Sequence, residues 1–229
     1  MNLAVISDSR LNFRSVTQLR ERSLLILASS SPRRRELLGN ISYPFQIIDS
    51  GVEENISDLH SPAAAAVILA ARKATAVAKR SRGVVLAADT VIDFRGRVLG
   101  KPENSAHAFR MLQLLRGEKH KVLTGLAVVN KCEGRKIVSV VSTEVRMRNY
   151  LDREIEEYVE SGEPSDKAGS YAIQGNGGRL VESTCGCYNN VIGLPLCEAV
   201  DLLKLMGFSF PEEHGICELA SGVSCPRVC

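Results

Sequence analysis

Apolar positions along the chain recur with two periods, one typical of strands and one typical of helices. β-Prone or alternating runs predict strands at residues 24–29, 43–49, 84–94, 120–130, 136–146 and 179–183. Helical spacing predicts helices over residues 32–38, 62–80, 151–160 and 197–206, and one more that begins at Asn104. Because helices alternate with strands, while Glu133-Gly134 joins two strands as a hairpin, we expect a mixed α/β sheet with helices on its faces.

The periodic pattern divides the chain of 229 residues into three parts. We assign residues 24–208 to one folded domain, residues 1–23 to a partly disordered N-terminal extension and residues 209–229 to a C-terminal tail. The hydrophobic content of 45% is ordinary for a globular protein, so the domain has enough apolar residues for a sizeable core.

Composition excludes several classes of function. A net charge of +3 and 5% aromatic residues are too little for a nucleic-acid-binding surface, and no apolar run approaches the roughly 20 residues that cross a membrane. The first 23 residues lack the apolar core of a secretory signal. Their Ser and Arg content leaves an organellar transit peptide as an alternative, against which Asp8 and Glu21 argue. Seven cysteines without a CxxC pair favour reduced thiols, as in a cytoplasmic protein.

The most informative segment is residues 27–35, LASSSPRRR. Ser31 suits the N-cap of a helix. Pro32 suits the first helical position, because an N–H at that position has no acceptor within the helix and its absence in proline costs no hydrogen bond. A helix N-terminus attracts anions, and three arginines follow it directly. The segment therefore predicts a site for a ligand with several negative charges.

Other candidate groups are ambiguous when each is taken alone. Asp89 follows apolar residues in a predicted strand, which suits a metal or a cleft but equally a turn at the strand end. Glu54 fits a solvated acidic turn, and Lys101, kept out of a helix by Pro102, fits an exposed loop. We interpret His120 as a strand residue, because no acidic partner lies beside it. Glycines and polar groups of residues 166–175 suit either a loop against a flat ligand or a packed structural loop.

The order of these motifs is far more specific than any one of them. The chain contains, in sequence, LASSSPRRRELL, GVEE, AARKA, AADT, GKP, HKVLTG, SGEPSDKAGSYAIQG and NNVIGLPL. Over residues 24–208 it thereby resembles the Maf family of nucleoside triphosphate pyrophosphatases. The resemblance implies an elongated α/β fold of the Maf and ITPase-like type, with a twisted mixed sheet flanked by helices and two lobes around a central cleft. It also implies hydrolysis between the α- and β-phosphates, a divalent metal (Mg²⁺ or Mn²⁺, with Co²⁺ as an alternative), and a homodimer.

The resemblance carries residue roles onto matching positions. Asp89 matches the family's proton acceptor, and Glu54 matches a second acidic position that helps to hold the metal; Asp89 as a metal ligand stays open. The positions that match the phosphate side are Ser29, Ser31, Arg33, Arg34, Lys73 and Lys101. The resemblance implies that Lys101 acts in catalysis together with Asp89 and Glu54. The positions that match substrate specificity are Arg33, Thr90 and Gln174.

These last positions match the branch of the family that acts on dTTP and UTP. The amide of Gln174 has both donors and an acceptor, which suits the O4 and N3–H edge of a pyrimidine. Two alternatives remain: the branch that acts on methylated GTP, and a non-catalytic nucleotide-binding regulator of cell division. We therefore expect house-cleaning of the nucleotide pool by hydrolysis of dTTP, UTP and modified pyrimidine nucleotides.

Overall fold

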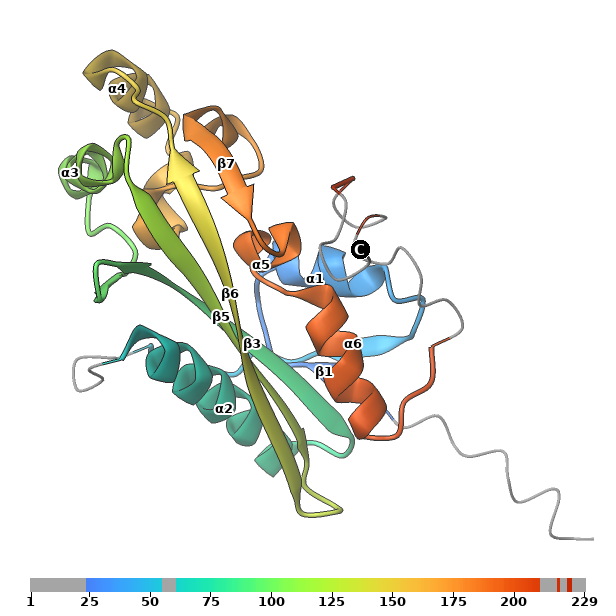
Figure 1. The fold of residues 1–229 in the computed structure, drawn as a ribbon. Helices are drawn as coiled ribbons and strands as arrows, with labels where there is room; N and C mark the ends of the chain where they lie inside the picture. Colours follow the sequence, from blue (N-terminus) through green and yellow to red (C-terminus); the bar gives the residue numbers. More distant parts are fainter. Residues whose placement is uncertain (1–23, 55–60, 211–217, 219–221, 224–229) are drawn as a thin grey trace, which may run out of the picture.

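A computed structural model describes residues 24–54, 61–210, 218 and 222–223 (Figure 1). The extension expected over residues 1–23 lies outside the described residues, as does most of the tail expected over residues 209–229. Within the described residues, no helix combines the length and the apolar character that a bilayer crossing requires.

The described residues form one seven-stranded mixed sheet, in the order β2-β1-β3-β5-β6-β7 with β4 paired to β3 (Figure 1). β1 is parallel to β2 and β3, whereas β3, β5, β6 and β7 pair antiparallel. The strands are β1 (Leu25–Leu27), β2 (Phe45–Ile47), β3 (Val84–Phe94), β4 (Arg97–Leu99), β5 (Lys119–Asn130), β6 (Arg135–Met147) and β7 (Val181–Cys185). The expected mixed sheet is confirmed.

Helices begin where the sequence has its capping residues. The helices are α1 (Pro32–Gly39), α2 (Pro62–Arg80), α3 (Ser105–Leu115), α4 (Asp152–Glu160), α5 (Tyr188–Ile192) and α6 (Leu196–Leu205). The side chains of Ser31, Ser61 and Asn104 each accept a hydrogen bond from a backbone N–H of the first turn that follows. The predicted starts of these three helices are therefore confirmed.

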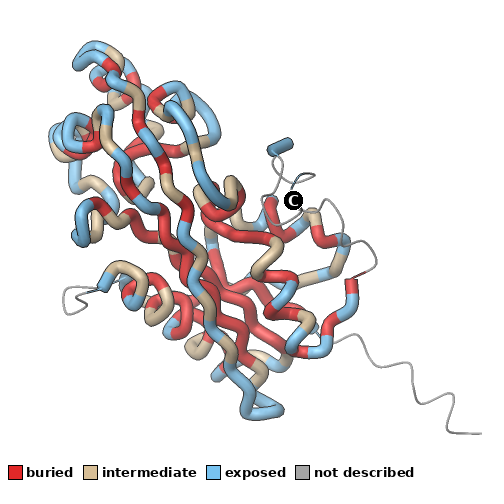
Figure 2. The backbone as a smooth tube through the Cα atoms, in the orientation of Figure 1, coloured by how far each residue is buried: buried red, intermediate tan, exposed pale blue. Residues whose placement is uncertain are grey.

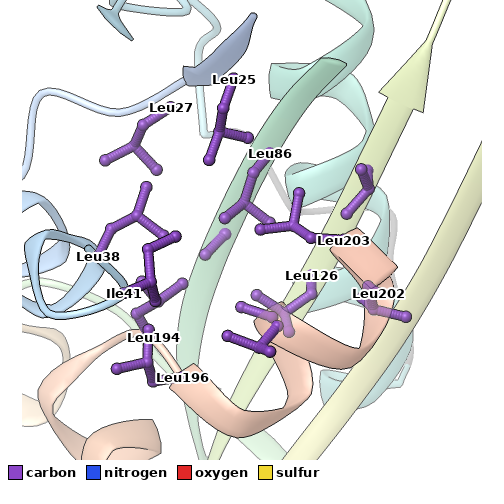
Figure 3. Close-up of a cluster of buried hydrophobic side chains, with 14 of the residues drawn as sticks. Leu25, Leu27, Leu38, Ile41, Leu86, Leu126, Leu194, Leu196, Leu202 and Leu203 are labelled. Carbon is purple, nitrogen blue, oxygen red and sulfur yellow. The ribbon is translucent and has the colours of Figure 1, made fainter. Parts of the chain in front are cut away.

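Alternate residues of the central strands belong to two separate hydrophobic cores, one on each face of the sheet. Leu25, Leu27 and Leu86 point toward α1 and α6, in the cluster drawn in Figure 3. Ile26 and Val85 point the other way and pack against α2. Since successive side chains of a strand face opposite sides, a nearly continuous apolar strand needs helices on both faces. Figure 2 shows β1 and most of β3 buried.

A further core defines the second lobe. The far ends of β3, β5 and β6 continue beyond the α2 and α6 layers and pack against α3 and α4, as Figure 1 shows. Ile92, Leu115, Met147 and Ile155 lie in this cluster, and each is at most 3% exposed. The long strands thus pass through both lobes, as the expected two-lobed fold requires.

The structure differs from the sequence expectations at several elements. β1 and β2 have three residues each, fewer than the predicted strands over residues 24–29 and 43–49. α5 was not expected, and β7 begins two residues later than the predicted strand. The glycine-rich loop over residues 169–178 contains parts of two 3-10 turns, η2 (Ala168–Ser170) and η3 (Asn176–Leu180). Cys132 and Cys185 are free thiols, but Cys197 is disulfide-bonded, so the expectation of reduced thiols is wrong at that position.

Candidate active site

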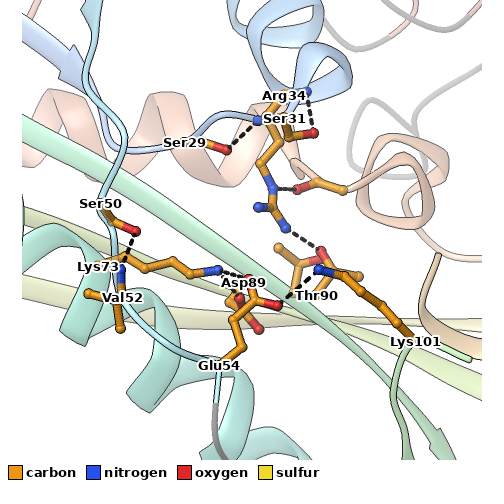
Figure 4. A network of polar contacts seen from close by, with 12 residues as sticks. Ser29, Ser31, Arg34, Ser50, Val52, Glu54, Lys73, Asp89, Thr90 and Lys101 are labelled. Atoms are coloured by element: carbon orange, nitrogen blue, oxygen red, sulfur yellow. Dashed lines mark hydrogen bonds and ion pairs between the residues drawn. The ribbon is translucent and has the colours of Figure 1, made fainter. Parts of the chain in front are cut away.

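A cleft of about 660 Å³ lies where the two lobes meet, and segments of both lobes line it. Its wall includes every residue that the sequence predicts for the site: Ser29, Ser31, Arg33, Arg34, Glu54, Lys73, Asp89, Thr90, Lys101 and Gln174. These residues come from the turn before α1, from α1, α2 and β3, and from loops (Figure 4). The fold therefore brings together residues that are up to 145 positions apart in the chain, the separation of Ser29 from Gln174 (174 − 29).

The N-terminus of α1 opens onto the cleft. Ser29 is buried, and its Oγ accepts a hydrogen bond from Ser31 N–H at 3.2 Å. Ser31 Oγ in turn accepts from Arg34 N–H at 3.5 Å and caps the helix. The serine turn thus fixes the backbone at the point where the Arg33 N–H and the arginine side chains reach the cleft, which is a favourable place for phosphate.

Arg34 is held at two points of its guanidinium. Nε donates to Gly193 O at 2.9 Å, and Nη2 donates to Thr90 Oγ1 at 3.1 Å (Figure 4). Burial lowers the pKa of Arg34, while the charges of Asp89 and Glu54 oppose that shift. A guanidinium stays protonated in proteins, so Arg34 presents a fixed positive charge to the cleft.

A cluster of four charged side chains lies beside Arg34, and two of them, Lys73 and Asp89, are buried. Lys73 Nζ is 2.6 Å from Glu54 Oε1 and 2.5 Å from Asp89 Oδ1, and Lys101 Nζ is 3.1 Å from Glu54 Oε2. Lys73 and Asp89 are only 6% and 5% exposed, so each charge needs an opposite charge beside it, which Lys73 has in both Asp89 and Glu54. The two lysines and two carboxylates therefore form one network along the cleft wall (Figure 4).

The two carboxylates of this network have different proton affinities. Burial raises the pKa of Asp89, and this effect exceeds the opposing attraction of Lys73 and Arg34. Burial also acts to raise the pKa of Glu54, but hydrogen bonds and charges from Lys73 and Lys101 prevail and lower it to about 2. Asp89 is consequently the better proton acceptor, while Glu54 stays an anion that holds the two lysines.

The three expected specificity residues occupy different environments. The hydroxyl of Thr90 already has hydrogen-bond partners. Thr124 Oγ1 donates its proton to Asn190 O at 3.2 Å, so in the 2.9 Å contact between the two hydroxyls Thr90 is the donor and Thr124 the acceptor. Thr90 therefore has only acceptor capacity left, part of which Arg34 uses. Arg33 is half-buried and Gln174 is exposed, and neither side chain has a hydrogen bond to any residue the structure describes. Their polar groups are available to a ligand.

Some cleft residues escaped the sequence argument. Ser50 is buried and accepts from Val52 N–H at 3.3 Å, which shapes the turn before Glu54. Lys167 also lines the cleft, where it pairs with Asp166; both lie in the glycine-rich motif, but nothing in that motif singles them out. The expectation for His120 is confirmed: it is a strand residue, buried outside the cleft wall, with Nε2 2.7 Å from the Tyr171 hydroxyl.

The comparisons with known proteins agree with this geometry. The family model of Maf-like proteins matches residues 24–206. The chain is 44% identical over 184 residues to a dTTP/UTP pyrophosphatase of Desulforamulus reducens, which covers 80% of this chain and 96% of that protein. It is 46% identical over 185 residues to a protein of the same name from Thermococcus onnurineus, with 81% and 98% covered. It is 47% identical over 186 residues to another from Moorella thermoacetica, with 81% and 96% covered. The chain belongs to the Maf family.

Proposed function

We propose that this protein is a nucleoside triphosphate pyrophosphatase that acts on dTTP, UTP and modified pyrimidine nucleotides. The observation that carries the proposal is the convergence of fixed cations, a buried carboxylate and a free amide on one cleft. The relatives named dTTP/UTP pyrophosphatase support the same reaction and substrate class. Hydrolysis of the α–β phosphoanhydride bond gives a nucleoside monophosphate and pyrophosphate, which removes unwanted nucleotides from the pool.

The chemistry follows from the placement of the charges. Asp89 accepts the proton of the attacking water, a role that its raised pKa favours. Arg34, Lys73 and Lys101 stabilise the negative charge that grows on the phosphate oxygens as the anhydride bond breaks. The first turn of α1 adds the backbone N–H of Arg33 and the positive end of the helix dipole at the same end of the cleft.

The donor set fits a divalent metal that is held partly by the substrate. Among the described residues, no three His, Cys, Asp or Glu side chains form a metal-binding group. Mg²⁺ is commonly held by one or two carboxylates together with substrate phosphates, which matches the pair Glu54 and Asp89. When bound, Mg²⁺, Mn²⁺ or Co²⁺ would acidify water and neutralise phosphate charge. Metal dependence is thus part of the proposal.

A cytoplasmic homodimer completes the proposal. The free thiols of Cys132 and Cys185 support a reducing compartment, and the disulfide at Cys197 is the observation against it. Sedimentation of the purified chain at several concentrations measures the dimer, and a monomer throughout would contradict it.

The test is a substrate panel with the products measured separately. dTTP, UTP, CTP and 7-methyl-GTP are incubated with Mg²⁺, Mn²⁺ or Co²⁺, and monophosphate, pyrophosphate and orthophosphate are quantified. We expect pyrophosphate from dTTP and UTP. Preference for 7-methyl-GTP would favour the methylated-GTP branch, and binding without turnover would favour the non-catalytic regulator. Orthophosphate as the direct product would overturn the reaction.

The matched variants are Asp89→Asn and Asp93→Asn. Both remove one negative charge from β3, but Asp93 lies outside the cleft, and its amide oxygen can still accept from Gly96 N–H. We expect Asp89→Asn to lower kcat at least 1,000-fold with an unchanged circular dichroism spectrum, whereas Asp93→Asn keeps its activity. Full activity of Asp89→Asn would remove Asp89 from the mechanism.

A further inference from the structure

Two side chains outside the cleft form hydrogen bonds to the backbone of the loop that carries Gln174. Tyr158 lies on α4, and Glu163 opens the 3-10 turn η1 (Glu163–Asp166) that follows it. Neither residue lines the cleft. Both contact the backbone at the ends of the loop over residues 172–177.

The carboxylate of Glu163 has three donors. Oε2 accepts from Asn176 N–H at 3.2 Å, and Oε1 accepts from Gly177 N–H at 3.3 Å and from the Tyr158 hydroxyl at 3.1 Å. The Tyr158 oxygen in turn accepts from Ala172 N–H at 3.1 Å. A phenol has one proton, and it is committed to Glu163, so the direction of every bond in this set is fixed.

The two ends of the loop are also in close contact. A Cβ at Gly177 would lie 2.4 Å from Ala172 O and 2.5 Å from the Tyr158 hydroxyl, and a Cβ at Gly178 would lie 2.5 Å from Ile173 O. Glycine is therefore required where the chain returns past its own start. The loop is closed at its base, and Gln174 lies between the two fastened ends with its amide unbonded to the described residues.

We infer that Glu163 and Tyr158 are positioning residues for selection of the nucleobase, acting through Gln174 without touching the substrate. The inference rests on the proposed pyrimidine specificity. A hydrogen bond from an amide discriminates between bases only if its backbone is fixed, because a mobile loop lets the amide rotate to suit either edge. The carboxylate of Glu163 supplies that fixation by accepting two backbone N–H groups at once.

The test compares Glu163→Gln with Glu160→Gln, a charge-matched control on the exposed end of α4. The amide at position 163 turns one acceptor into a donor, so at least one of the three bonds is lost. We expect KM for dTTP and UTP to rise about tenfold with kcat nearly unchanged, and the preference over CTP to fall about tenfold. The inhibition constant of inorganic tripolyphosphate, which reports the phosphate end alone, should stay within twofold for both variants.

A double-mutant cycle with Gln174→Ala separates positioning from general damage. If Glu163 acts through Gln174, Glu163→Gln causes no further loss of base preference in the Gln174→Ala background. Tyr158→Phe removes only a hydroxyl and provides a second variant, with a smaller loss in the same direction, should Glu163→Gln unfold. Additive losses, or a tripolyphosphate constant that rises with KM, would overturn the inference. A wild-type enzyme that turns over neither dTTP nor UTP overturns the proposed function itself, whereas wild-type preference retained in Glu163→Gln overturns only the inference.

Discussion

Three adjacent arginines at the start of α1 have three different environments. Arg34 is fixed by Gly193 O and Thr90 Oγ1, Arg33 is half-buried on the cleft wall without a hydrogen bond to any described residue, and Arg35 is exposed and outside the cleft. One turn of a helix spans 3.6 residues, so three successive side chains point in directions roughly 100° apart. The three arginines therefore differ in role: Arg34 is a fixed cation, Arg33 is a cation available to a ligand, and Arg35 is solvated.

Replacement of Arg34 by lysine tests whether the fixed geometry matters in addition to the charge. An ammonium has no planar fork and cannot reach the Gly193 carbonyl and the Thr90 hydroxyl together. We expect Arg34→Lys to lower kcat/KM for dTTP about 10- to 100-fold, the equivalent of about one hydrogen bond to a charged group. Arg35→Lys, the same change one residue further, should keep wild-type kinetics. Equal effects of the two substitutions in steady-state assays would contradict a special role for Arg34.

At the scale of elements, α2 lies unusually close to the sheet. A Cβ on Gly125 of β5 would fall 2.3 Å from Ala66 O of the helix, so only glycine allows this approach. The same helix carries Lys73 to Asp89 on β3. The register between β5 and α2 therefore also places the charge network.

Gly125→Ala should push α2 away from the sheet. Overpacking of a buried contact of this kind costs about 1–3 kcal/mol, so we expect a lower free energy of unfolding in urea titrations together with lower activity. Gly39→Ala is the control, since a Cβ at that position meets nothing within 4 Å and its φ is not positive. Unchanged stability of Gly125→Ala would show that α2 can shift at little cost.

How far each element can be predicted depends on how local its determinants are. The starts of α1 and α2 follow from Ser31-Pro32 and Ser61-Pro62, because an N-cap acts within one turn. α5 has only five residues, and Asn190 within it bonds to Val122 O and Thr143 Oγ1 of distant strands. No local pattern reveals such contacts. The family motifs identified the residues of the cleft wall. The hydrogen bonds between Glu163 and the loop that carries Gln174 became visible only in the structure, because they also join segments apart in the sequence.

At the scale of the whole molecule, the long strands couple the two lobes. β3 contributes Leu86 to the core under α6 and Phe94 to the core under α3 and α4. β5 likewise extends through both, with Leu126 in the first core and Val122 in the second. Neither lobe can unfold without removing strands from the other. A titratable group buried in one lobe therefore affects the stability of the entire domain.

His120 in β5 is such a group. It is 3% exposed, its Nδ1 has no hydrogen-bond partner in the part of the chain that the structure describes, and burial lowers its pKa from 6.5 to about 4. Between pH 6.5 and pH 4, His120 is protonated in the unfolded chain but neutral in the folded protein. The free energy of unfolding therefore falls as the pH falls through this range, by up to roughly 3 kcal/mol.

His120→Gln removes this titration while its amide can still meet the Tyr171 hydroxyl. We expect the variant to be less stable than the wild type at pH 7 and to approach or exceed it at pH 4, because the wild type alone loses the histidine contribution. Urea unfolding at half-unit pH steps measures the free energy of unfolding of both proteins. Their difference cancels the stability that both lose below pH 4.5 as Glu54 becomes protonated. A constant difference between His120→Gln and wild type across this range would mean that His120 binds its proton as readily in the folded protein as in the unfolded chain, and that burial does not lower its pKa.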